Sequence, residues 1–143
     1  MAADPLTGRA NLAHWTGMAG DPAGARDQFA VLLPILEGGL GGDHLYTLLT
    51  RAHLAYWTGM AGDPAGARDQ YAVLLPIEER VLGPEHLYTL LCFASLAHWT
   101  GMAGDPAGAR DQYAVLLPIE ERVLGPDHPY TLLSRANLAH WGG

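Results

Sequence analysis

The sequence predicts an all-α protein built as an array of antiparallel helix pairs, with about seven helices. Three observations lead to this fold class. Tryptophans recur every 42 residues, at Trp15, Trp57, Trp99 and Trp141. The segment WTGMAGDPAGARDQ begins unchanged at each of the first three. Each unit contains two segments with the apolar spacing of a helix. No segment alternates apolar and polar residues as a half-buried strand does.

The repeat also predicts how the chain is organised. Residues 54–95 and 96–137 are identical at 36 of 42 positions, which indicates either recent duplication or deliberate construction. We expect one solenoid domain over residues 1–143, with repeats at 4–45, 46–87 and 88–129 and a terminal half-repeat at 130–143. A chain of 143 residues is long enough to bury a core without disulfides or a metal.

Each element follows from local signals, which are clearest in the third repeat. The first helix of a pair, the A helix, covers 88–103, where Leu and Ala are frequent, and it ends before Gly104. Asp105-Pro106 then supplies an N-cap and a proline at the first helical position, which begins the second helix, the B helix. The same signals predict helices near 5–19, 22–37, 46–61, 64–82, 88–103, 106–124 and 130–141.

Two features of the B helices predict irregularity. Each contains an internal proline (Pro34, Pro76, Pro118), which removes a backbone hydrogen bond and should bend or split the helix. The first repeat reads Glu37-Gly38-Gly39-Leu40-Gly41-Gly42 where the second reads Glu79-Arg80-Val81-Leu82-Gly83-Pro84. We therefore expect the first B helix to fray early.

Composition excludes several classes of function. Only 16% of residues are charged, the net charge is −7, and the eight basic residues are all arginine without a basic run. This disfavours nucleic acid and anionic membranes as partners. The single cysteine, the lack of signal-peptide features and the lack of a long apolar run predict a cytoplasmic protein. No phosphate loop, paired carboxylates, catalytic triad or CxxC pair occurs, so we expect no enzyme and no cofactor.

A helical wheel of the third A helix separates two faces. Around Ser95, within roughly 60°, lie Tyr88, Leu91, Cys92, His98, Trp99 and Met102. The opposite side carries Leu90, Phe93, Ala94, Leu96 and Ala97, the expected core stripe. Because both sides are largely apolar and the predicted array has only two helix layers, the Ser95 side is predicted to be an apolar binding surface.

The repeat resembles the 42-residue tetratricopeptide repeat of kinesin light chain and of many actinobacterial regulatory proteins. The resemblance covers nearly the whole chain and is carried by Leu54-Ala55, Gly62, Ala67, Tyr71 and the connector Gly83-Pro84-Glu85-His86. It implies a right-handed solenoid whose A helices line a concave groove that holds peptides or partner proteins.

Against this family, the groove positions here are unusually apolar. Met18, Met60 and Met102 stand where relatives commonly have glutamate. In each later repeat a tyrosine replaces the family's acidic residue (Tyr46, Tyr88, Tyr130), and a leucine replaces a polar residue (Leu49, Leu91, Leu133). The family's groove asparagine corresponds to Asn11, His53, Ser95 and Asn137. The predicted ligand-binding groove is Asn11, His14, Met18, Tyr46, Leu49, His53, Tyr56, Met60, Tyr88, Leu91, Ser95, His98, Met102, Tyr130, Leu133, Asn137 and His140.

Other chemistry-bearing residues are interpreted as structural. Groove histidines on successive repeats should lie about 10 Å apart, too far for one zinc ion, so no metal site is predicted. His44, His86 and His128 are expected to hydrogen-bond a helix end. Cys92 is read as a small groove residue, and Arg68-Asp69 and Glu78-Glu79-Arg80 with their copies as solvated surface. For the four tryptophans, packing between repeats and stacking on a ligand both stay open.

The leading hypothesis is a non-catalytic scaffold whose concave groove binds an apolar or aromatic-rich peptide or protein. Methionine adapts its shape and tyrosine offers a large contact area, which suits such recognition. One alternative is a homo-oligomer that uses the same apolar faces, since an A helix at 130–141 has no polar cap after it. Another is a small-molecule or enzymatic groove that uses histidine and tyrosine.

Overall fold

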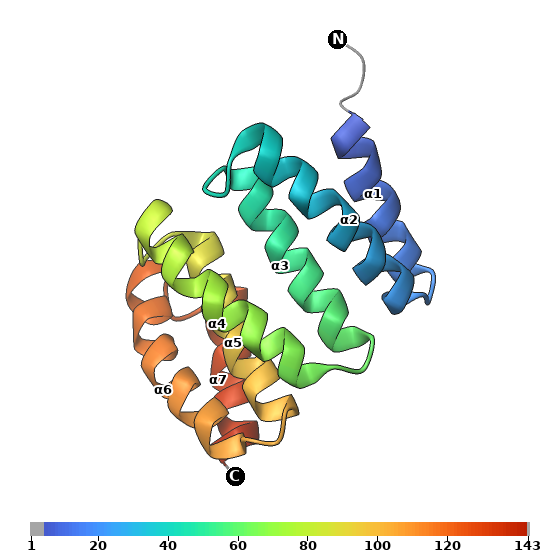
Figure 1. The fold of residues 1–143 in the computed structure, drawn as a ribbon. Helices are drawn as coiled ribbons and strands as arrows, with labels where there is room; N and C mark the ends of the chain where they lie inside the picture. Colours follow the sequence, from blue (N-terminus) through green and yellow to red (C-terminus); the bar gives the residue numbers. More distant parts are fainter. Residues whose placement is uncertain (1–4, 143) are drawn as a thin grey trace. The chain divides into compact units, whose positions relative to one another are not determined.

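Seven helices and no strand make up residues 5–142, the part of the chain that this computed structural model describes. Figure 1 shows the helices in chain order: α1 (Pro5–Met18), α2 (Pro22–Leu40), α3 (Leu45–Met60), α4 (Pro64–Val81), α5 (Leu87–Met102), α6 (Pro106–Val123) and α7 (Pro129–Gly142). The A helices are α1, α3, α5 and α7. The predicted helices and their order are confirmed, with most ends within one residue of the prediction.

The first B helix is the exception. The prediction that it frays early is wrong, because α2 continues to Leu40 and, at 19 residues, is one residue longer than α4 and α6. Gly41, with φ of 90°, ends it, and its N–H donates to the Glu37 carbonyl. Pro34, Pro76 and Pro118 lie inside α2, α4 and α6 without splitting them.

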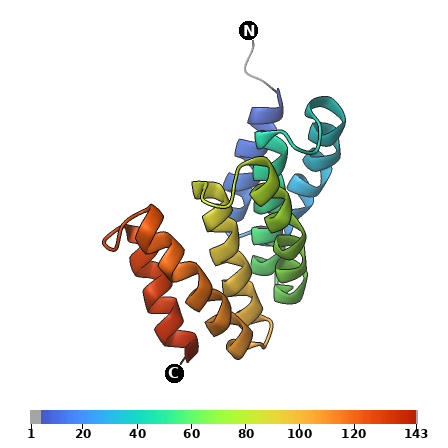
Figure 2. The ribbon, with the colours of Figure 1, turned by 90° about the vertical axis from the view of Figure 1, so that its left-hand side faces the viewer.

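The chain forms two compact units, one ending at Gln70 and the other beginning at Tyr71 within α4. In the first unit α2 packs against both α1 and α3. In the second unit α6 packs against both α5 and α7, which run side by side with it in Figures 1 and 2. Each unit therefore contains a B helix packed against two A helices.

The turn from A helix to B helix is built by the repeated Gly-Asp-Pro-Ala-Gly segment. Gly20 has φ of 101°, a conformation that only glycine adopts at little cost, and it directs the chain out of α1. Asp21 caps α2 by accepting a hydrogen bond from the Gly24 N–H at 2.9 Å. A Cβ on Gly24 would collide with that carboxylate, which explains a second glycine three residues after the aspartate.

The connector histidines cap the A helices, as predicted. The Nδ1 atoms of His44, His86 and His128 each accept a hydrogen bond of 3.1 Å from the backbone N–H two residues later. Each imidazole thereby satisfies a backbone donor that the first helical turn leaves without an intrahelical partner.

Tryptophan and glycine interlock between successive A helices. In the first unit Trp57 is 4% exposed and lies over Gly17, where a Cβ would come within 2.5 Å of the indole. Around it, the core contains Phe29, Leu32 and Leu36 of α2. The second unit repeats the device with Trp141 over Gly101, next to a core of Leu90, Ala97, Tyr113 and Leu116. Of the two roles left open for tryptophan, the structure supports packing between repeats for these residues.

No helix in the described part of the chain is long and apolar enough to cross a membrane.

Candidate functional site

In the first unit, the predicted groove residues form one side of the A helices that we call the N-terminal face: Asn11, His14, Met18, Tyr46, Leu49, His53, Tyr56 and Met60. Leu49 is half-buried and the others are exposed. Tyr46 is 55% exposed and Met60 48%, so large apolar and aromatic groups of α3 are open to solvent.

In the second unit the corresponding positions form the C-terminal face: Tyr88, Leu91, Ser95, His98, Met102, Tyr130, Leu133, Asn137 and His140. Met102, Tyr130, Leu133 and His140 are exposed and the remainder half-buried. On α5, Phe93, Ala94 and Leu96 of the predicted core side are also half-buried, so burial alone does not separate the two sides of this helix.

Rings on both faces rest on the repeat tryptophans. Tyr56 packs edge-on to Trp57 with ring centroids 4.9 Å apart, and His98 packs on Trp99 in the same way at 4.8 Å. Trp57 and Trp99 are each 4% exposed. The wheel's placement of Trp99 in the groove is therefore wrong, because the indole fills the interior and only supports the ring beside it.

Cys92 is likewise part of the interior and not a small groove residue. It is 3% exposed, its thiol lies 3.9 Å from the Tyr71 carbonyl oxygen, and it hydrogen-bonds the Glu78 side chain. Burial, followed by the nearby charges of Glu78 and Glu79, raises the pKa of the thiol far above its ordinary value. A nucleophilic role at neutral pH is therefore disfavoured.

Two carboxyl groups predicted to be solvated are buried. Glu78 is 3% exposed and Glu120 1%, and in each one carboxyl oxygen has no hydrogen-bond partner. Loss of hydration on burial raises the pKa of Glu78 to about 7, and it also raises that of Glu120. The signal for burial was present in the spacing, because Glu78 follows Tyr71 and Leu74 at seven and four residues, on the core stripe of α4.

The other charged residues of that prediction do lie at the surface. Arg68 pairs with its neighbour Asp69 at 3.0 Å, and Asp69 is largely exposed. Pairs between Arg122 and Glu85, at 2.6 Å, and between Arg135 and Glu121, at 2.9 Å, join different segments of the second unit. Exposed pairs of this kind contribute little to stability.

The groove histidines do not converge. The His53 ring stacks on Phe29 with centroids 5.2 Å apart, and the partial loss of hydration in this packing, followed by repulsion from His14, lowers its pKa. Burial also lowers the pKa of His98. Among the described residues no group of three His, Cys, Asp or Glu side chains could hold a metal ion.

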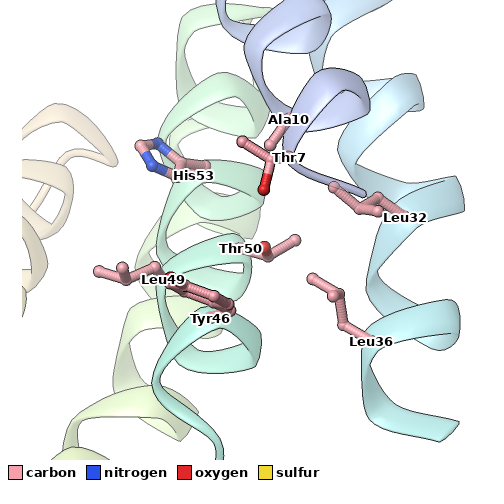
Figure 3. A pocket seen from close by; sticks show the side chains of 8 residues that line it. All are labelled: Thr7, Ala10, Leu32, Leu36, Tyr46, Leu49, Thr50 and His53. Atoms are coloured by element: carbon pink, nitrogen blue, oxygen red, sulfur yellow. The ribbon is translucent and has the colours of Figure 1, made fainter. Parts of the chain in front are cut away.

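A pocket of about 210 Å³ opens beside the N-terminal face, between α1, α2 and α3 (Figure 3). The sequence did not predict it as a separate site. Its lining residues are Thr7 and Ala10 of α1, Leu32 and Leu36 of α2, and Tyr46, Leu49, Thr50 and His53 of α3. In Figure 3 Thr7, Thr50, Leu32 and Leu36 extend toward one another between the three helices.

These features define an all-helical repeat protein of the scaffold class, with accessible side chains along one side of its A helices. The tetratricopeptide repeat model matches residues 47–88 and 89–130, more than half of the chain. The chain belongs to the tetratricopeptide repeat family, a family whose general role is protein interaction.

Solved structures show the same fold. A Podosopora anserina protein described as a kinesin light chain with nearly identical TPR-like repeats superposes with a TM-score of 0.86 at 22% identity, covering 96% of this chain and 65% of that one. A single-substitution variant of that protein gives the same values. BtubC (BKLC) from P. vanneervenii gives a TM-score of 0.84 at 17% identity, covering 99% of this chain and 58% of that one.

The fold is thus an all-α tetratricopeptide-like solenoid of the kinesin light chain type. The chain spans less than two thirds of the length of each of these structures. No curated protein matches the sequence.

Proposed function

We propose that this protein is a non-catalytic scaffold whose A helices bind an apolar or aromatic-rich peptide or protein partner. The observation that carries this proposal is the exposure of large side chains on the two faces. Met60 is 48% exposed and Met102 51%, and Tyr56, also exposed, stands one helical turn before Met60. Exposed apolar groups that recur at one repeat position indicate a contact surface.

The chemistry of the faces favours peptide binding over catalysis. The thiol of Cys92 is buried, the described residues hold no metal-ligand cluster, and the histidines of the faces lie in separate repeats. Methionine and tyrosine instead supply adaptable and rigid apolar contact area, respectively. We therefore rank a small-molecule or enzymatic groove below a protein-binding one.

The test is selection from a random peptide library on the full chain. We expect enrichment of peptides rich in Trp, Phe, Leu or Tyr, and at least tenfold weaker binding after Met60→Glu with Met102→Glu. A carboxylate at these positions must lose water when an apolar partner arrives, which costs several kcal/mol if it is buried unpaired. Since both methionines are about half exposed, the fold should survive the change.

Val73→Glu with Val115→Glu is the matched control, because these valines are 56% and 58% exposed but lie on the B helices. This control should bind the selected peptides as the parent does. Unchanged binding in the methionine variant, or equal loss in the valine variant, would remove the A-helix faces from the site.

A second candidate is self-association through exposed apolar groups. Leu12, Trp15 and Met18 of α1 are each more than 60% exposed, which favours burial against another molecule. Burial against a second copy needs no ligand, so association of the purified chain alone distinguishes it from peptide binding.

A further inference from the structure

The pocket of the first unit exists at a position where the repeats differ in sequence. Leu36 is the residue of the first repeat that corresponds to Glu78 and Glu120 in the next two. In the second unit, the Glu120 carboxyl is 1% exposed and hydrogen-bonds Ser134, the counterpart of Thr50. In the first unit alone, therefore, a leucine stands where the other repeats have a buried carboxyl group, and this side of the pocket is apolar.

A second substitution keeps the first pocket open. Thr7 corresponds to Leu91 of the third repeat, so the α1 side of the pocket carries the shorter side chain. Thr7 is exposed, and its hydroxyl stands above that of Thr50 in Figure 3. These two hydroxyls are among the few polar groups of a pocket whose lining is mostly apolar.

Apart from the phenol of Tyr46, the only ionisable side chain among the described residues that line the pocket is the imidazole of His53. Loss of hydration lowers the pKa of that imidazole, which favours its neutral form. A charged ligand group would thus find no counter-charge among these described residues, and an uncharged one would lose little hydration on entering.

Volume limits what can occupy the pocket. An apolar cavity of about 150 Å³ is large enough to bind benzene. Sites for whole cofactors or drug-sized molecules are roughly 300–1,000 Å³. At about 210 Å³, this pocket has room for a single side chain and not for a cofactor.

We propose that the pocket between α1, α2 and α3 is an anchor subsite that accepts one uncharged apolar side chain of the peptide partner, and that Leu36 determines this specificity. The inference rests on the proposed function, of which it names one subsite. Adjacent Tyr46, Leu49 and His53 belong to the N-terminal face, so a peptide on that face could insert a side chain without leaving it.

The test uses side-chain probes, so that it does not depend on finding a peptide. N-acetyl amides of leucine, tryptophan and aspartate are titrated into the full chain, and the methyl resonances of Leu36 and Thr50 are followed by NMR. The leucine and tryptophan amides should shift these resonances in a saturable manner, and the aspartate amide should not. Equal shifts with aspartate, or none with either apolar amide, would overturn the proposal.

Variants locate the binding. Leu36→Glu, which installs the residue of the other repeats, should abolish the shifts, and Thr7→Leu should do so by filling the pocket from an exposed position. Because Thr7 is exposed, the second variant should fold even if the first does not. Glu120→Leu, the matched change in the second unit, should leave the shifts in place. Full retention of the shifts in Thr7→Leu would contradict the assignment.

The two proposals fail separately. Suppose that the selected peptides need the two methionines but bind Thr7→Leu as tightly as the parent. The proposed function would then stand, and the anchor subsite would be refuted. Saturable probe binding without any selected peptide would support an apolar subsite and count against the peptide scaffold.

Discussion

Glu78 is a charged residue placed inside the packing of the second unit. Glu78 is only 3% exposed, and one of its carboxyl oxygens has no hydrogen-bond partner. The side chain that hydrogen-bonds this carboxyl group is the thiol of Cys92, which is itself buried. A thiol is a weak hydrogen-bond donor and cannot replace the lost water. The folded state therefore favours the protonated acid, and the pKa rises to about 7 from 4.5.

The sign of the pH dependence follows from this pKa. Below about pH 4.5 the carboxyl is protonated in both states and its contribution to stability is complete. Between about pH 4.5 and 7 the unfolded chain ionises first, so stability falls with rising pH by about 3 kcal/mol in total. Glu78→Gln should flatten this slope, which urea unfolding at a series of pH values from about 5 to 8 measures.

Glu79→Gln serves as the control, because this neighbour is exposed. It should keep the parent's slope, and part of the slope should persist in Glu78→Gln because Glu120 is buried in the same way. Identical slopes for the parent and Glu78→Gln would show that the Glu78 carboxyl stays ionised in the folded protein.

At the scale of helices, the Trp57–Gly17 contact fixes how closely α1 and α3 approach. Adding a Cβ to Gly17 would bring it within 2.5 Å of the indole, so Gly17→Ala must move a ring that is 4% exposed. We expect a loss of about 1–3 kcal/mol, the range for overpacking a core. Urea unfolding measures it.

Gly8→Ala is the matched control on the same helix. Apart from the adjoining backbone of α1, no atom of the described residues lies within 4 Å of a Cβ built there, so alanine should stabilise α1 by about 0.5–1 kcal/mol. If both alanines stabilise the protein, Gly17 is not needed for the close approach of the two helices.

The helices themselves were predictable from local signals, whereas the extent of their burial was not. Asp105-Pro106 and Gly104 placed the start of α6 and the preceding turn correctly, because caps and positive φ angles act within a few residues. The Ser95 wheel put Trp99 and Cys92 in the groove because it treats one helix at a time. An A helix packs against several neighbours, and the width of its buried arc depends on them.

The same limitation explains the acids and the pocket. Glu78 was predicted to be solvated because it is charged, although its spacing from Tyr71 and Leu74 places it on the core stripe. The pocket depends on Leu36, Thr7 and Thr50, which come from three helices, so no single segment could reveal it. The predicted groove residues are accessible, and their role in binding stays a prediction.

At the scale of the whole molecule, exposed apolar area should cause self-association. Trp15 is 65% exposed, whereas Trp57 and Trp99 at the same repeat position are 4% exposed. An aromatic side chain of this kind contributes roughly 150–250 Å² of area when it is buried. With Leu12 and Met18 also exposed on α1, contact with a second copy would remove the patch from water.

We therefore expect a homodimer or larger oligomer at micromolar concentration, with closed two-fold pairing favoured because it consumes both copies of the patch. Light scattering over a hundredfold dilution from about 100 μM should show mass falling toward the monomer's 15.3 kDa. Trp15→Arg should be monomeric throughout, while Val115→Arg, at a position 58% exposed on α6, should associate as the parent does. A parent mass of 15.3 kDa at every concentration would exclude self-association in this range. Association that persists in Trp15→Arg would move the contact away from α1.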